Sequence, residues 1–229
     1  MFNKIRDEVK LEDIYPMIHF ECHGSPDGLY VTNGEFITWQ ELRRYLIDIN
    51  YACRLNLVIV LAACNGYHII KVAEKLDRAP FLLIIGPEGE VSTGDVERDF
   101  DAFYASFFDD LDGYAALNSL NRSLGPSAWK YHIMSAEALF INAYVKYYKE
   151  NCTGKRKRER IENLITKGMK DPRVQNFGVG KTRKLIKQKL TVANEEHFNR
   201  KKKQFFFVDE FPDNMKRFPF SFNDVLIKV

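Results

Sequence analysis

Two short motifs place a histidine and a cysteine in similar local settings. The first, "HFECHG" (residues 19–24), ends in His23-Gly24, and the second, "LAACNG" (residues 61–66), contains Cys64 two positions before a glycine. A neighbouring imidazole can activate a thiol as a nucleophile, because cysteine thiols, with a usual pKa of about 8.5, keep their proton at neutral pH. The amide hydrogens of Gly24 and Cys64 would hold the oxyanion that forms when a carbonyl group is attacked. The motifs therefore predict a catalytic dyad of His23 and Cys64.

Each of these residues also has a plainer interpretation. A histidine at a strand end is often a packing or surface residue, and free cysteine is often an inert buried hydrophobe. We favour the dyad because both residues follow consecutive predicted strands and each has a glycine close behind it. A zinc site made of His19, Cys22 and His23 is disfavoured, since a strand would point these side chains to different faces and no second ligand cluster follows. We predict no metal and no other cofactor, and expect His19 and Cys22 to pack.

Three apolar runs predict the strands that carry these motifs. "YPMIHFEC", "LNLVIVLAA" and "APFLLIIGP" have the aliphatic, β-branched character of strands buried in a parallel sheet. Between the first two runs, Asn33-Gly34 predicts a hairpin turn, and Thr38 with Glu41 predicts the capping box of a helix. The carboxyl ends of neighbouring parallel strands lie at one edge of a sheet, so His23 and Cys64 are expected side by side there.

The third apolar run is followed by a loop and an aromatic helix. The loop "GPEGEVSTGD" contains Glu88, Glu90 and Asp95, which are candidates for a substrate pocket that prefers a basic side chain. We favour a solvated loop in which Asp95 stabilises the first turn of the next helix through the helix dipole. Ser92 begins that helix, whose apolar stripe is interpreted as core packing and consists of Phe100, Phe103, Tyr104, Phe107 and Phe108.

Composition indicates a globular chain without membrane segments. The 229 residues are 45% hydrophobic, and no apolar run approaches the roughly 20 residues that a bilayer requires. The N-terminal segment has no apolar signal sequence, and four cysteines are scattered without a disulfide framework. These features predict a cytoplasmic protein with reduced thiols and no membrane partner.

The C-terminal part of the chain differs in charge. Residues 151–203 contain 17 basic and 5 acidic residues, a net charge of about +12, which leaves about −9 for the rest. "SAEALFINAYVKYYKENC", capped by Ser135, and two basic segments predict helices, and a phenylalanine-rich tail is expected to strap across an apolar surface. The favoured interpretation is a solvated face or a complement to the acidic front domain; binding of nucleic acid is the less favoured alternative.

The two motifs resemble those of the caspase-like cysteine peptidases, and within them the CHAT-type branch. Residues 62–66, "AACNG", keep the core of the family motif, and the resemblance covers roughly residues 14–135. It implies a three-layer α/β fold, a mostly parallel sheet flanked by helices, and endopeptidase activity on protein substrates. Ala62 stands where caspases carry glutamine, so their preference for aspartate is not carried over.

The resemblance also implies strands before the histidine strand, whereas only about fourteen residues precede it. We therefore expect a sheet that lacks the usual N-terminal strands, completed by a missing segment or a partner chain. The predicted domains are a caspase-like peptidase domain, residues 1–135, and a helical, basic extension with an aromatic tail, residues 136–229. The predicted function is a His-Cys endopeptidase; the alternative is an inactive caspase-like module whose basic helices bind nucleic acid or a protein partner.

Overall fold

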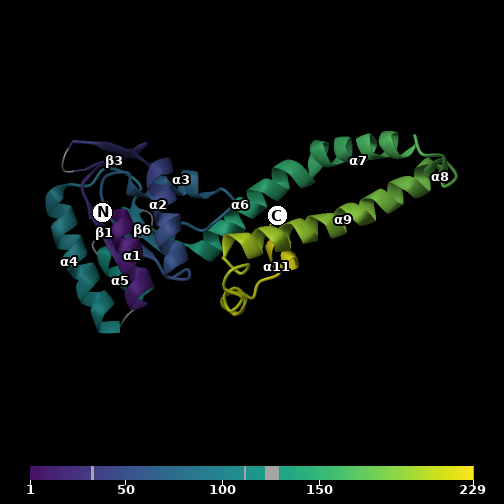
Figure 1. Ribbon diagram of the computed structural model, residues 1–229. Helices are drawn as coiled ribbons and strands as arrows, with labels where there is room; N and C mark the ends of the chain where they lie inside the picture. The colour runs from purple at the N-terminus through teal and green to yellow at the C-terminus, as the bar shows by residue number, and fades with distance from the viewer. Residues whose placement is uncertain (32–33, 111, 122–128, 229) are drawn as a thin grey trace. The chain divides into compact units, whose positions relative to one another are not determined.

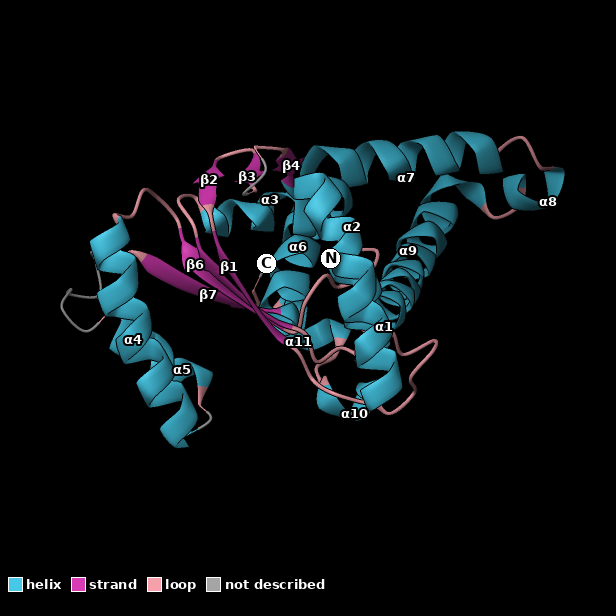
Figure 2. Cartoon of the chain, turned by 60° about the vertical axis from the view of Figure 1, so that its left-hand side comes forward, coloured by secondary structure: helices cyan, strands magenta, loops and turns pink. Residues whose placement is uncertain are grey.

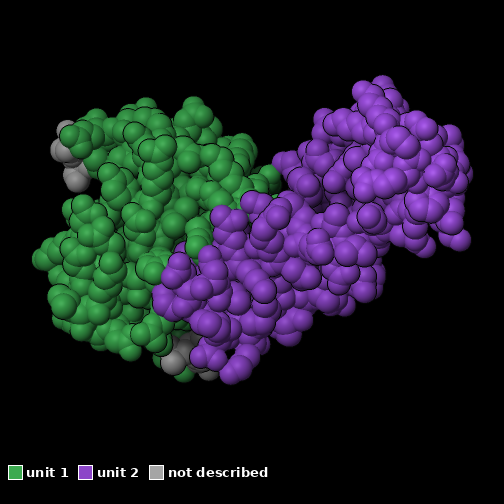
Figure 3. Space-filling model, turned by 45° about the vertical axis from the view of Figure 1, so that its right-hand side comes forward, with its two compact units in different colours: residues 1–139 green, residues 140–229 purple. Residues whose placement is uncertain are grey.

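The computed structural model describes residues 1–31, 34–110, 112–121 and 129–228 (Figure 1). The chain forms two compact units, unit 1 (Met1–Leu139) and unit 2 (Phe140–Val229), which are distinguished by colour in Figure 3. The boundary predicted from the sequence, after residue 135, lies four residues earlier. Helix α6 (Ala136–Cys152) runs through the division, and the two units are described separately below.

Unit 1 is an α/β unit built on a mixed, mostly parallel sheet, as predicted. The strand order is β1-β5-β6-β7, in which β1 pairs with β5 and β5 with β6 in parallel, while β7 is antiparallel to β6 (Figure 2). The strands are β1 (Met17–Glu21), β5 (Val58–Ala62), β6 (Leu83–Pro87) and β7 (Tyr131–Ser135). The three apolar runs form the three parallel strands, whereas β7 was not predicted.

A small antiparallel sheet follows β1 directly. It has the order β2-β3-β4 and consists of β2 (His23–Ser25), β3 (Gly28–Tyr30) and β4 (Phe36–Thr38). The strands of the predicted hairpin are present as β3 and β4, while Asn33 lies outside the described residues. The capping box is confirmed, because the Thr38 hydroxyl accepts from the Glu41 amide and the Glu41 carboxylate accepts from the Thr38 amide at the start of α2 (Trp39–Ala52).

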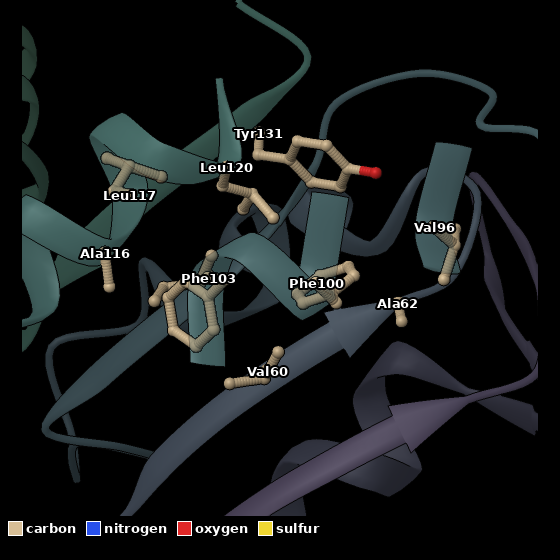
Figure 4. Close-up of a cluster of buried hydrophobic side chains, with 10 residues drawn as sticks. Val60, Ala62, Val96, Phe100, Phe103, Ala116, Leu117, Leu120 and Tyr131 are labelled. Atoms are coloured by element: carbon tan, nitrogen blue, oxygen red, sulfur yellow. The ribbon is translucent and has the colours of Figure 1, made fainter. Parts of the chain in front are cut away.

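Helices cover both faces of the main sheet. On one face lie α4 (Thr93–Asp110) and α5 (Gly113–Leu120), and on the other lie α1 (Phe2–Glu12), α2 and α3 (Ile70–Ala73), which follows the 3₁₀ helix η1 (Gly66–Ile69) (Figure 2). Alternation along β5 turns Val60 and Ala62 toward α4 and α5, where they join the aromatic cluster of Figure 4.

The aromatic stripe of α4 is core packing for only part of its length. Phe100 and Phe103 are buried in the cluster of Figure 4, as expected. Phe108 is 69% exposed, so the prediction that it belongs to the core is wrong. Phe108 stacks on half-buried Tyr104, one turn earlier, and this row of the helix lies at the margin of the buried face.

Unit 2 is helical and has an aromatic core of its own. Phe140 and Tyr144 of α6 pack against Phe198 and Phe205 of the long helix α9 (Gly178–Phe205). The remaining helices are α7 (Gly154–Gly168), α8 (Pro172–Gln175), α10 (Asn214–Arg217) and α11 (Phe222–Leu226).

The phenylalanine-rich tail belongs to this core. Phe206 and Phe220 contact the Phe140 ring, and Phe222 contacts Phe198. The expectation that the tail straps across an apolar surface is therefore confirmed, because its rings pack on those of α6 and α9 and complete the core of unit 2. None of the helices in the described ranges combines the length and apolar character needed to cross a membrane.

Candidate active site

The register of β1 on β5 brings the two predicted dyad residues to one edge of the sheet. Glu21 of β1 pairs with Ala62 of β5 in the last rung of the ladder. His23 and Cys64 each lie two residues beyond this rung, and because the strands are parallel, both leave the sheet in the same direction. His23 begins β2, and Cys64 lies in the turn between β5 and η1.

The main chains of the two motifs are in direct contact. A Cβ atom on Gly24 would lie 2.0 Å from the Cys64 carbonyl oxygen and 3.1 Å from the Cys64 nitrogen. No side chain fits at that distance, so this approach requires glycine at position 24. The two residues predicted to bind an oxyanion through their amides are therefore adjacent in space.

Both motifs line a cavity of about 1010 Å³ in unit 1. His23, Gly24 and Cys64 form part of its wall, and Glu21 is the carboxylate among the described residues that line it. Most other lining side chains are apolar and include Phe2, Phe20, Leu29, Val31, Ile37, Leu42 and Val96. The cavity therefore offers an apolar space beside a thiol and an imidazole.

The Cys64 thiol is held by the main chain of Val91. The sulfur accepts a hydrogen bond from the Val91 amide at 3.4 Å and donates one to the Val91 carbonyl at 3.5 Å. The next residue is tied to the same loop, because the Asn65 amide donates to the Gly89 carbonyl at 2.9 Å. His23 is exposed, and among the described residues no hydrogen bond joins it to Cys64. The dyad residues share an edge and a cavity, while the thiol is hydrogen-bonded elsewhere.

His19 and Cys22, the other two residues of the first motif that were considered as zinc ligands, are partly buried. His19, which was expected to pack, contacts the Phe100 ring and shares a hydrogen bond with the Tyr104 hydroxyl through Nδ1. Burial lowers the pKa of His19, although Glu21 opposes this effect, and burial raises the pKa of the Cys22 thiol. Within the described ranges no cluster of three or more histidine, cysteine or acidic side chains is arranged to hold a metal ion.

The three carboxylates of the loop after β6 do not form the pocket wall. None of Glu88, Glu90 and Asp95, all of which are described, lines the cavity. Asp95 pairs with Arg98 and Lys130, both at 2.8 Å, and hydrogen bonds from these cations hold the pKa of its carboxyl well below the usual range. Exposed Glu88 faces His132 at 3.4 Å. The less favoured candidate, a pocket of carboxylates, is therefore not supported, and the cavity wall near this loop is made by Val91, Thr93 and Val96. The favoured interpretation agrees with the structure, because Glu88 and Glu90 are exposed and Asp95 lies in the first turn of α4.

Sequence reasoning missed several residues of the site. Val91 contacts Cys64 through main-chain atoms, so its residue type gave no indication of this role, although the loop around it was identified. Phe2 reaches the cavity wall from α1, and its ring contacts those of Phe20 and Tyr45. Phe20 and Glu21 belong to the first motif itself, but the sequence does not reveal which side of the strand end faces a cavity.

Comparison with known proteins adds no family assignment. No family model matches the chain, and no curated protein matches it.

Proposed function

We propose that the chain is a caspase-like cysteine endopeptidase of the CHAT type, with Cys64 as nucleophile and His23 as general base. The observation that carries this proposal is the parallel register of β1 and β5, which delivers both residues to one edge and one cavity. The contact between Gly24 and Cys64 supports it further, because the amides intended for the oxyanion then lie next to the nucleophile.

In the proposed reaction, His23 takes the Cys64 proton as the sulfur attacks the carbonyl carbon of a peptide bond. A bond forms between sulfur and carbon, and the carbonyl oxygen becomes an oxyanion beside the Gly24 and Cys64 amides. Collapse of this intermediate breaks the carbon–nitrogen bond, and His23 returns the proton to the leaving amine. Water then hydrolyses the thioester and regenerates the thiol.

This reaction requires the thiol to leave Val91. In the conformation described, the Cys64 thiol donates a hydrogen bond to the Val91 carbonyl, so the proton that His23 would remove is engaged there. The sulfur also accepts a hydrogen bond from the Val91 amide. We infer that substrate binding in the cavity displaces the loop that contains Gly89 and Val91. Such rearrangement is common, since hydrogen bonds between catalytic groups often form only in the substrate complex.

The cavity wall supports a substrate class. Its apolar side chains would bury a hydrophobic side chain of the substrate near the bond that is cleaved, and Glu21 is available for a polar or basic neighbour. We therefore expect cleavage of peptides with an aliphatic or aromatic residue near the scissile bond.

The test compares the parent chain with Cys64→Ala and His23→Gln on a peptide library and with an alkylating probe. Cys22→Ala is the matched control, because Cys22 is a second thiol in the same cavity wall. We expect Cys64→Ala to lose cleavage and site-specific labelling, His23→Gln to lose cleavage, and Cys22→Ala to retain both. Equal cleavage by the parent chain and Cys64→Ala would overturn the proposal.

The second candidate is an inactive module of the same fold that binds a partner. It is favoured by one observation, the engagement of the Cys64 sulfur by both polar groups of the Val91 backbone. This candidate predicts that no peptide is cleaved and that Cys64 stays unlabelled until the chain is unfolded. Labelling of Cys64 in the folded chain would exclude it.

A further inference from the structure

Unit 2 contains a helical pair that buries a small apolar cluster between its own helices. Ile161 and Ile165 of α7 pack with Leu190 of α9, and partly buried Met169 and Ile186 join them. The two helices run side by side in opposite directions and are connected through α8 (Figure 1). The outer surface of the pair is therefore mainly polar and charged.

The charge on this surface is strongly positive. Residues 140–229 contain 22 lysines and arginines against 10 aspartates and glutamates, a net charge of +12, while residues 1–139 have 12 against 21, or −9. On α7 alone, the exposed basic residues are Lys155, Arg156, Lys157, Arg158, Arg160 and Lys167. Ion pairs neutralise few of them, and Lys155 with Glu159 at 3.7 Å is one such pair.

The two sides of the helical pair differ in how their charges are balanced. One side is marked by the ion pair between Glu162 of α7 and Arg183 of α9, at 2.9 Å. Helical spacing adds to this side Lys155 and Arg158, seven and four residues before Glu162, and Lys187, four residues after Arg183. Two of the four cations on this side are paired with acidic residues, Arg183 with Glu162 and Lys155 with Glu159.

The opposite side carries a cationic face, defined here as Arg156, Arg160 and Lys167 of α7 with Lys189 and Arg200 of α9. All five are exposed, and steps of four, seven and eleven residues align them in one row on each helix. One acidic residue, Glu196, falls in the α9 row.

The two rows of the cationic face meet around His197, whose ring stacks on Tyr147 at 4.9 Å. Burial lowers the pKa of His197, and the charges of Arg200, Lys201 and Arg160 lower it further. Arg160 of α7 and Arg200 of α9 therefore lie on the same side of the pair, close to one imidazole. These three cations disfavour protonation of His197, as is expected where positive side chains are not balanced by nearby acidic ones.

We propose that the cationic face binds the phosphate backbone of a double-stranded nucleic acid. Each row spans eleven residues, about 16 Å at 1.5 Å per residue. Over that length a duplex carries about nine phosphates, one per 1.7 Å of axis, so a row of this length can contact several phosphates. Arginine suits this role because its guanidinium binds phosphate oxygens in pairs. A membrane surface fits less well, because interfacial helices require a broad apolar face. On this pair, exposed lysines and arginines outnumber the exposed apolar side chains, which are Leu164, Val179, Leu185 and Val192.

The proposal does not depend on the dyad, and its test uses the full chain. Fluorescence anisotropy would measure binding of labelled DNA and RNA duplexes of about two helical turns over a range of salt concentrations. The triple variant Arg160→Gln, Lys189→Gln, Arg200→Gln removes three cations from the face. We expect its affinity to fall about 100-fold at about 0.1 M salt, and the slope of log K against log salt to become shallower by about 3.

The matched control is Lys155→Gln, Arg158→Gln, Lys187→Gln, which removes the same charge from the opposite side. All six residues are exposed, so both variants are expected to fold, and far-ultraviolet circular dichroism checks this. The control is expected to bind within a few-fold of the parent chain. Equal losses in the two variants would overturn the proposed face, since binding would then follow net charge alone. Absence of duplex binding by the parent chain, or binding only to phosphatidylserine vesicles, would overturn the proposal as a whole.

Discussion

Unit 1 and unit 2 organise their functional candidates in different ways. In unit 1, a single rung of the sheet, Glu21 with Ala62, fixes where a sulfur and an imidazole leave the strands. In unit 2, the notable feature is spread over two helices as rows of exposed cations, and these helices pack together through Ile161, Ile165 and Leu190. The register of two strands fixes the positions of two residues, whereas helical spacing distributes several residues over a surface. Single substitutions should therefore act sharply in unit 1 and only in combination on the surface of unit 2.

The two units also use aromatic residues differently. In unit 1 the rings of α4 lie over one face of the sheet, and the row ends in exposed Phe108 (Figure 4 shows its buried part). In unit 2 rings from α6, α9 and the tail converge on Phe140 and Phe198. Residues far apart in the sequence thus close the second core, and the tail is essential to it.

The largest expected effect tests whether unit 2 is packed as tightly as unit 1. Phe103 and Phe198 are both 0% exposed, so replacing either by alanine leaves a cavity and should lower the free energy of unfolding by about 3–5 kcal/mol. Exposed Phe108→Ala is the control and should change it by less than about 0.5 kcal/mol. Urea denaturation followed by circular dichroism measures all three. A Phe198→Ala variant as stable as the control would mean that the tail does not close a core.

A smaller effect compares two glycines in the two units. Gly24→Ala places a methyl group against the Cys64 carbonyl, a backbone atom that cannot move alone, so we expect a loss of about 1–3 kcal/mol and of peptide cleavage. Gly180→Ala in α9 meets nothing within 4 Å and should stabilise the chain by about 0.5–1 kcal/mol through helix propensity. The same denaturation experiment reports both. A neutral Gly24→Ala would contradict the close contact between the two motifs.

The smallest effect separates the environments of two histidines. Burial is the main cause that lowers the pKa of both His19 and His197. Nearby charges act in opposite directions: Glu21 raises the pKa of His19, whereas the cations Arg200, Lys201 and Arg160 lower the pKa of His197. Added salt screens these charges, so the pKa of His197 should rise while that of His19 should stay or fall. NMR titration of the imidazole signals at low and high salt measures this. Equal shifts in the two residues would argue against an unbalanced positive charge in unit 2.

The same two histidines imply a direction for stability against pH. Their folded pKa values lie below the usual value of about 6.5, so the unfolded chain binds more protons at mildly acidic pH. Their contribution to stability is therefore complete above about pH 6.5 and is lost as the pH falls through the folded values. Replacing His19 by glutamine should weaken this dependence in unit 1.

Features that depend on local sequence could be predicted well. The three parallel strands follow from apolar runs, and the capping box of α2 follows from Thr38 and Glu41 alone. Placing His23 and Cys64 at one edge required only that their strands be parallel neighbours, which the parallel pairing of β1 with β5 satisfies.

Features that depend on distant partners could not be predicted in the same way. β7 is only five residues long, and its antiparallel pairing is decided by β6 rather than by its own sequence. Asp95 was one candidate for the pocket wall, but Lys130, 35 residues later, binds it instead. Val91 holds Cys64 through main-chain atoms, and any residue other than proline could do the same.

The hydrogen bonds between Val91 and Cys64 also affect how readily the protein is oxidised. The cysteine thiolate attacks a peroxide oxygen and breaks the O–O bond, at a rate that depends on access to the sulfur. Because the main chain of Val91 engages both the thiol proton and a sulfur lone pair, the sulfur is shielded from conversion to sulfenic acid until the loop moves. Oxidation of Cys64 should therefore be faster while the loop is displaced from it. Oxidised protein should accumulate with the number of substrate-binding events.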